Sequence, residues 1–164
     1  MAMLRALAAS ILLPCLVSAR IPPEPAAGPP VAQAADEKGV LATIDALFAA
    51  FESGDSAAML RQVYPDGRVT ASGTRGDGAS NLRPQSWTMF AERITPQRAF
   101  RERIANPTVQ IDDHIAMVWA PFVVRVGGKV SNCGIDHFDL VRESGVWKVM
   151  NLTFSSRTTG CPAQ

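Results

Sequence analysis

Apolar side chains recur every three or four residues between Asp36 and Ser53, which is the period of an α-helix with one buried face. That face would consist of Val40, Leu41, Ile44, Leu47, Phe48 and Phe51. Asp36 can cap the first turn, and Ser53-Gly54 is a natural stop. The pattern therefore predicts one long amphipathic helix near the start of the fold.

Two shorter helices are expected further along the chain. Asp55 can cap the first of them, which the turn residues 65–67 would end, and Ser86 can cap another that runs from Trp87 to about Ile94. The glycine-rich stretch 72–80 between them has no period. It also lacks the spacing and following helix of a phosphate-binding loop, so we expect a surface loop there.

The C-terminal half has the composition of β-strands separated by tight turns. Asp112-Asp113, Gly127-Gly128 and Ser144-Gly145 divide it into four runs, at residues 99–111, 114–126, 129–142 and 146–157. With a first strand near 68–71, the predicted order is α-α-β-α-β-β-β-β. We predict an α+β fold, a cone in which a curved antiparallel sheet packs against the long N-terminal helix.

The N-terminal segment has the pattern of an export signal. Arg5, the apolar run 6–17 and the small residues Val17-Ser18-Ala19 are typical of a secretory signal peptide over residues 1–19, which implies a periplasmic or secreted protein. A lipoprotein signal modified at Cys15 is the alternative, although Pro14 disfavours it. Residues 20–35 are rich in Pro and Ala, which predicts a disordered linker, with a second cleavage pattern at 32–34. Residues 36–164 would form the domain.

Composition excludes several classes of protein. The 164 residues suit one folded domain, and the net charge of +1 does not favour binding to nucleic acid. No apolar run reaches the roughly 18 residues that a membrane span requires. No ligand-like spacing of His, Cys and carboxylates occurs, so neither a metal nor a cofactor is expected.

The C-terminal strands and their spacing resemble a known family. Residues 115–122, the run 132–141 and Trp147-Lys148-Val149, with 83–87 and the closing Gly160-Cys161, are similar to the lumazine-binding branch of the nuclear transport factor 2-like superfamily. This resemblance covers roughly residues 38–161 and implies the cone-shaped fold. It does not decide the function, because the superfamily includes isomerases, dehydratases, cyclases, binding domains and adaptors. The residue before the cysteine is often His in this branch and is Asn132 here.

Two-residue turns at Gly127-Gly128 and Ser144-Gly145 would set the register of the last three strands. Trp119 would then lie opposite Asp136, and Asp136 opposite Thr153. We expect one face of the sheet to line an apolar pocket with Met117, Trp119, Asp136, Phe138, Asn151 and Thr153. The other, convex face is available for a homodimer.

Asp136 is the candidate catalytic residue, because a carboxyl group among aromatic side chains has a raised pKa and can act as a general acid or base. The alternative is that Asp136 only accepts hydrogen bonds that hold the sheet together. His137 and Asp139 share a face and are either an acid–base pair or ordinary sheet residues.

These observations favour an exported domain that binds a small apolar or aromatic molecule, with no assignable reaction. A cofactor-free isomerase, hydratase or cyclase that uses Asp136 is one alternative. A structural homodimer or adaptor is another.

Two cysteines, Cys133 and Cys161, remain after the signal peptide, and an exported protein meets oxidising conditions. The predicted register places Cys133 opposite Ser156, so a chain reversal at 158–160 would allow a disulfide. The alternative is a buried Cys133 and a free thiol at Cys161.

Overall fold

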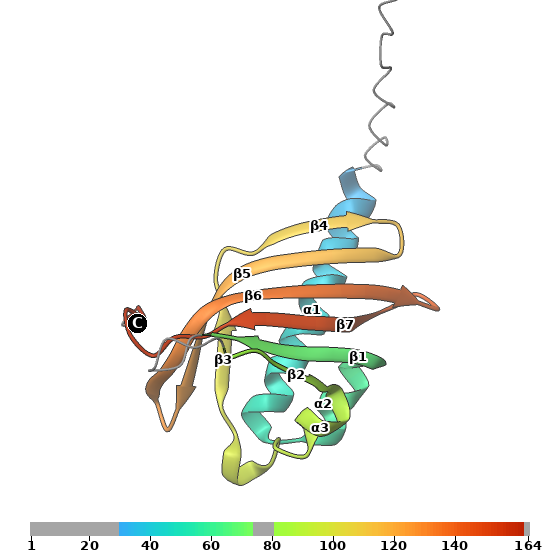
Figure 1. Cartoon of the computed structure of the whole chain (residues 1–164). Helices are drawn as coiled ribbons and strands as arrows, with labels where there is room; N and C mark the ends of the chain where they lie inside the picture. The colour runs from blue at the N-terminus through green and yellow to red at the C-terminus, as the bar shows by residue number, and fades with distance from the viewer. Residues whose placement is uncertain (1–29, 74–80, 163–164) are drawn as a thin grey trace, which may run out of the picture.

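A computed structural model describes residues 30–73 and 81–162 of the chain. The long helix α1 (Pro30–Ser53) lies across the concave side of a curved sheet, as Figure 1 shows. The α+β fold predicted from the sequence is confirmed. The predicted signal peptide and most of the predicted linker lie outside the described residues.

The start of α1 differs from the expectation. The composition predicts a disordered linker over residues 20–35, but residues 30–35 are helical, and Asp36 lies inside the helix rather than at its cap. Pro30 fits the first turn because that position donates no hydrogen bond within the helix, and the alanines that follow are good helix formers. The predicted stop is confirmed: α1 ends at Ser53, and Gly54 has a φ of 69°.

The two short helices begin where their caps predict. The carboxylate of Asp55 accepts a hydrogen bond from the amide of Ala58 at the start of α2 (Ser56–Gln62). The hydroxyl of Ser86 accepts one from Met89 at the start of α3 (Trp87–Ala91). A short 3₁₀ turn, η1 (Pro96–Arg98), connects α3 to the strands that follow.

In the described part of the chain the sheet has seven strands, in the order β2-β1-β7-β6-β5-β3, and β4 also pairs with β5. All pairs are antiparallel except β1 with β7, which are parallel. The strands are β1 (Val63–Ser72), β2 (Arg83–Ser86), β3 (Arg101–Ile104), β4 (Thr108–Asp112), β5 (Ile115–Val126), β6 (Lys129–Glu143) and β7 (Val146–Ser155).

Three strand predictions need correction. The expected strand 99–111 is two strands, because the chain turns at Asn106, whose φ is 44°. Both pieces pair with β5, one at each end of it. The first strand begins at Val63 and continues through the turn-like residues 65–67, and β2 was not expected at all.

A β-bulge alters the predicted register between β5 and β6. Next to the Gly127-Gly128 turn the pairing is as predicted, with Val126 opposite Lys129. A shift between Val124 and Arg125 then moves the rest of the ladder by one residue. Trp119 consequently lies opposite His137 rather than Asp136.

A second bulge has the same effect between β6 and β7. Next to the Ser144-Gly145 turn the pairing is again as predicted, but the register shifts between Asp139 and Leu140. Asp136 therefore lies opposite Phe154 instead of Thr153. Because successive side chains on a strand face opposite sides of the sheet, each one-residue shift exchanges the two faces. The predicted pocket residues are therefore divided between the two faces of the sheet.

The core lies between α1 and the concave face of the sheet. The predicted face of α1 is buried there, and the Phe48 and Phe138 rings meet edge to face at 6.0 Å. The sheet contributes Ala116, Val118, Phe138, Leu140, Trp147, Val149 and Leu152. Among the described residues, no helix has the length and hydropathy needed to cross a membrane.

Candidate functional site

An apolar cavity of about 290 Å³ opens between the end of α1, helix α3 and the inner faces of β3, β5 and β7. Five phenylalanines supply most of its surface, and Glu102 is the carboxyl group among its lining residues. The cavity is lined by Phe51, Phe90, Arg98, Phe100, Glu102, Phe122, Val124, Val126, Ser131, Asn132, Leu152 and Phe154. An apolar cavity with few polar groups is typical of small-molecule sites.

Glu102 reaches this cavity because of strand alternation on β3. It pairs with Val124 of β5, whose side chain is also buried, while its neighbours Arg101 and Arg103 are exposed. Glu102 is only 6% exposed, and burial raises its pKa from 4.5 to about 8. At neutral pH the carboxyl group is therefore mostly protonated and can donate a hydrogen bond.

Asp136 is buried deeper, at 0% exposure, between Ala120 on β5 and Phe154 on β7. Neither of its carboxyl oxygens receives a hydrogen bond from any residue that the structure describes. Burial raises the pKa of Asp136 well above its usual value, and Glu102 raises it further once its own carboxyl group is ionised. Asp136 does not itself line the cavity, but its cross-strand neighbour Phe154 does.

The other predicted site residues lie elsewhere. Phe138 is fully buried in the core, on the same face as Asp136. Trp119 is 51% exposed on the outer face and packs against the His137 ring at 5.8 Å. Met117 and Thr153 occupy that outer face as well, and neither lines the cavity. A cavity shared by all six predicted residues is not present in the described part of the chain.

Asn151 and the His137–Asp139 pair also belong to the outer face. The side-chain oxygen of Asn151 accepts a hydrogen bond from the Arg68 amide at 3.1 Å, and its nitrogen donates to Asp139 at 3.4 Å. His137 and Asp139 lie 3.5 Å apart, and both side chains are partly exposed. These contacts join β1, β7 and β6 on the outer side of the sheet.

Glu102 was missed by the sequence analysis, although a signal for it exists. Phe100, Glu102 and Ile104 alternate along one strand, so a period of two places the carboxyl group on the same side as two apolar residues. The flanking arginines instead suggest an exposed, charged segment. Only the pairing with β5 shows which side is buried.

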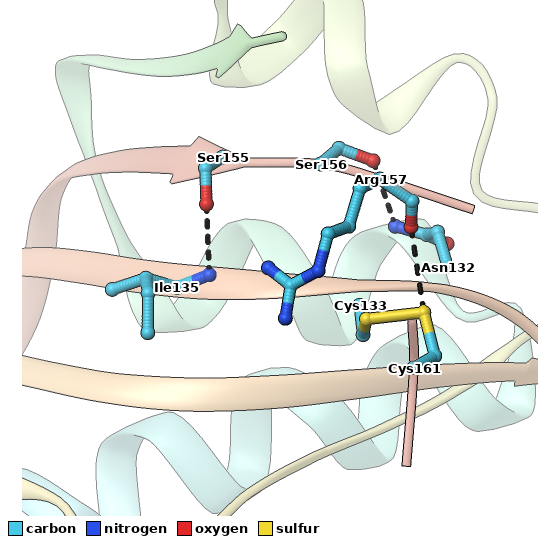
Figure 2. The surroundings of a disulfide bond; sticks show 7 residues. All are labelled: Asn132, Cys133, Ile135, Ser155, Ser156, Arg157 and Cys161. Atoms are coloured by element: carbon cyan, nitrogen blue, oxygen red, sulfur yellow. Dashed lines mark hydrogen bonds between the residues drawn. A yellow bond between two sulfur atoms is a disulfide. The ribbon is translucent and has the colours of Figure 1, made fainter. Parts of the chain in front are cut away.

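Cys133 and Cys161 form a disulfide with a Cα–Cα distance of 5.6 Å, as predicted. Cys133 exchanges two backbone hydrogen bonds of 3.0 Å with Arg157, not with Ser156, because the bulge in β7 moves the pairing by one residue. The chain then reverses at Gly160, whose φ is 66°. Figure 2 shows the bond beside the bridge between Cys133 and Arg157.

Two side-chain hydrogen bonds, one donated by Asn132 and one accepted by Ser155, join β6 to the end of β7 and the residue after it. The amide of Asn132, which lines the cavity, donates to the Ser156 hydroxyl at 3.1 Å. The Ile135 amide donates to the Ser155 hydroxyl at 3.0 Å (Figure 2). Gly134 lets β7 come this close, because a Cβ there would lie 2.0 Å from the Ser155 carbonyl oxygen.

The phenylalanine-lined cavity suits recognition of a small molecule by its shape and by hydrogen bonding. Aromatic rings offer surface to a flat apolar molecule, and a protonated Glu102 can donate to an acceptor on it. Within residues 30–73 and 81–162, no group of His, Cys and carboxylates is arranged to hold a metal ion.

Comparison with known proteins agrees with this fold. Residues 35–155 match a family model described as "Putative lumazine-binding", and no curated protein sequence matches. A protein of unknown function with a cystatin-like fold from Nostoc punctiforme is 11% identical, with a TM-score of 0.62 over 77% of this chain and 94% of that one. An NTF2-like protein with a cystatin-like fold from Novosphingobium aromaticivorans is 16% identical, with a TM-score of 0.61 over 80% of this chain and 87% of that one.

A third similar structure is the β subunit of a putative aromatic-ring-hydroxylating dioxygenase from Novosphingobium aromaticivorans. It is 16% identical and covers 80% of this chain and 95% of that chain, with a TM-score of 0.62. At these identities the structures show the fold alone, whereas the family match extends over most of the domain. The chain therefore belongs to the family described as "Putative lumazine-binding", and its fold is similar to that of NTF2-like proteins.

Proposed function

We propose that this chain is an exported domain that binds a small, flat, largely aromatic molecule without converting it. The observation that carries this proposal is the cavity of about 290 Å³, in which five phenylalanines surround the buried carboxyl group of Glu102. Its volume lies at the lower end of the range for small-molecule sites. A lumazine is a planar two-ring heterocycle with carbonyl and ring-nitrogen acceptors, so the family description supports a ligand of this kind.

Glu102 would select ligands that carry a hydrogen-bond acceptor. Burial keeps its carboxyl group mostly protonated at neutral pH, and an unpaired O–H group in an apolar cavity is costly. A carbonyl oxygen or a ring nitrogen would satisfy that donor, whereas a purely hydrocarbon ligand would leave it unpaired. The expected preference is therefore for aromatic heterocycles over hydrocarbons of the same size.

Export is part of the same proposal and has separate support. The signal-like pattern at residues 1–19 and the disulfide between Cys133 and Cys161 are both expected of a periplasmic or secreted protein. Sequencing of the mature N-terminus tests this. A start at Arg20 or near Ala35 supports export as a free protein, and a lipid-modified Cys15 contradicts it.

Binding is tested with lumazine as the probe and with native mass spectrometry of the purified chain for any co-purified small molecule. We expect saturable binding that Glu102→Ala weakens about tenfold, since it removes one buried donor. Glu102→Gln, which keeps an N–H donor, should retain most of the affinity. Leu152→Trp should block binding by filling the cavity. Glu143→Gln, on an exposed residue, is the matched control.

The proposal fails if lumazine does not bind and no small molecule accompanies the protein. It also fails if Glu102→Ala and Leu152→Trp bind the probe as the unchanged chain does. Thermal melts of each variant show that the fold is intact, so that a loss of binding reports on the cavity.

A second candidate is a cofactor-free isomerase, hydratase or cyclase. The observation that favours it is Asp136, a buried carboxyl group with a raised pKa and no hydrogen-bond donor among the described residues. Because Asp136 does not line the cavity, it would act through Glu102, and Asp136→Asn should then lower the turnover of a bound carbonyl compound and shift its pH dependence while leaving the affinity unchanged. Unchanged turnover in Asp136→Asn would exclude this role.

A homodimer through the outer face of the sheet is a separate proposal. It is supported by two large apolar side chains, Trp119 and Ile115, that are 51% and 58% exposed on β5. Light scattering of the purified chain tests it, with Trp119→Ser expected to shift the mass toward a monomer. A monomeric wild-type chain at micromolar concentration contradicts it.

A further inference from the structure

Asp136 is fully buried, and neither of its carboxyl oxygens has a hydrogen-bond partner among the described residues. Buried polar groups in folded proteins nearly always have such a partner, so Asp136 is an exception that a ligand would explain. We propose that Asp136 is a second point of contact for the ligand of the phenylalanine-lined cavity, and that it selects heterocycles with a lactam or imide edge. This inference rests on the proposed function, because it specifies the ligand class of the same cavity.

Two of the rings that line the cavity are also neighbours of Asp136. Phe154 lies directly opposite Asp136 on β7. Phe122 packs over Gly134, which precedes Asp136 by two residues on the same face of β6, and a Cβ on Gly134 would lie 2.9 Å from its ring. The Phe122 and Phe154 rings meet edge to face at 6.0 Å. These two rings therefore separate Asp136 from the cavity.

Phe154 is the ring that has room to move. It is only partly buried, whereas Phe122 is 2% exposed. The row across the inner face of the sheet runs from Ala71 through Phe154 and Asp136 to Ala120, so a small side chain lies beside each of the two middle residues. A turn of the Phe154 ring over Ala71 would open the cavity to the carboxyl group of Asp136.

The chemistry of Asp136 defines the ligand group that it would bind. Burial raises the pKa of Asp136 well above its usual value, which favours the protonated form. In that form one oxygen donates a hydrogen bond and the other accepts one, side by side. A lactam or imide edge presents a C=O group next to an N–H group, so it can form two hydrogen bonds with the carboxyl group at once. A hydrocarbon edge would leave the buried donor and acceptor unpaired.

Glu102 and Asp136 would then hold opposite ends of one flat molecule. Their partners on β5 are Val124 and Ala120, which lie four residues apart on the inner face with Phe122 between them. The carboxyl groups are close enough for an ionised Glu102 to raise the pKa of Asp136. A two-ring heterocycle would therefore lie along Phe122, with a ring-nitrogen acceptor at Glu102 and its lactam or imide edge at Asp136.

Calorimetric titration with three flat two-ring ligands tests this arrangement. Lumazine has both ends, quinoxaline has only the ring nitrogens, and quinazolinedione has only the imide edge. Lumazine should bind about tenfold more tightly than quinoxaline, because lumazine also satisfies Asp136. In Asp136→Leu that preference should disappear, while the affinity for quinoxaline stays the same. Asp136→Asn, whose amide again places a donor beside an acceptor, should keep the preference.

Two other variants separate Asp136 from Glu102 and from general damage to the fold. Glu102→Ala should lower the affinity for lumazine to that for quinazolinedione, but it should leave the preference of lumazine over quinoxaline intact. Asp139→Leu is the matched control, because Asp139 lies on the outer face of the same strand and its side chain is 48% exposed. It should bind all three ligands as the unchanged chain does. Thermal melts show that each variant is folded.

Difference infrared spectroscopy tests the contact itself. The carbonyl stretching band of a protonated carboxyl group moves to lower frequency when the group gains hydrogen bonds. Lumazine should move a band that is missing from Asp136→Asn, and quinoxaline should leave that band in place.

The inference is overturned if lumazine and quinoxaline bind equally well, if Asp136→Leu weakens both to the same extent, or if lumazine leaves the Asp136 band unmoved. In each of these cases binding that depends on Glu102 would leave the proposed function standing. If none of the three ligands binds the unchanged chain, the proposed function and this inference both fail.

Discussion

The buried carboxyl group of Glu102 makes the stability of this fold depend on pH. Its pKa is about 8 in the folded chain and near 4.5 when the chain is unfolded, so the folded state holds a proton that the unfolded state releases. Because the pKa of Glu102 is higher in the folded chain, the proton on Glu102 stabilises the folded state. This stabilisation is fully present below about pH 4.5 and is lost as the pH rises toward 8. Stability should therefore fall across this window.

The magnitude follows from the size of the shift. Each pH unit between the two pKa values changes the free energy of unfolding by about 1.4 kcal/mol. Between pH 5 and pH 8 the loss due to Glu102 is therefore about 4 kcal/mol, a large part of the 5–15 kcal/mol typical of a domain. Glu102→Gln keeps the shape of the side chain and never ionises. The variant should match the unchanged chain near pH 5 and exceed its stability by about 4 kcal/mol at pH 8.

Urea unfolding at pH 5, 6, 7 and 8 measures this difference, with the fluorescence of the buried Trp87 and Trp147 as the signal and the disulfide intact. Because the Glu102 charge also raises the pKa of Asp136, the difference between the two proteins reports on Glu102 together with its effect on Asp136. Glu143→Gln, which removes an exposed carboxylate, is the control and should follow the unchanged chain. If the stabilities of the unchanged chain and Glu102→Gln run parallel from pH 5 to pH 8, the account of Glu102 as a buried, protonated group is refuted.

Three other changes test the packing and the covalent link. Phe138→Ala should cost about 3–5 kcal/mol in urea unfolding because it removes a fully buried ring that packs against Phe48; a cost below 1 kcal/mol would contradict that packing. Gly134→Ala should force β7 away, because its Cβ would lie 2.0 Å from the Ser155 carbonyl oxygen. We expect a loss of stability of about 1–3 kcal/mol and a lower melting temperature, and an unchanged melting temperature would contradict the close approach. Cys161→Ser opens a link between residues 28 positions apart and should cost about 3–4 kcal/mol, whereas equal stability in the two proteins would show that the link does not restrict the unfolded chain.

The local features of this fold were predictable from the sequence because they depend on near neighbours. Asp55 and Ser86 cap the helices that follow them, and α1 stops at Ser53 before Gly54. The turns at Gly127-Gly128 and Ser144-Gly145 set the pairing next to them as predicted. The C-terminal cysteines also meet as expected. Side chains close to these turns, such as Trp147 and Val149, therefore lie on the predicted face.

The register beyond the two bulges could not be predicted from local sequence. A bulge bends its strand locally, and the residue that it leaves unpaired depends on partners distant in the sequence. One shift moves Trp119 from the expected pocket to the outer face, and the other does the same to Thr153. Asp136 stays buried, but its neighbours become Ala120 and Phe154. Glu102 enters the cavity only because β3 pairs with β5 in one particular register.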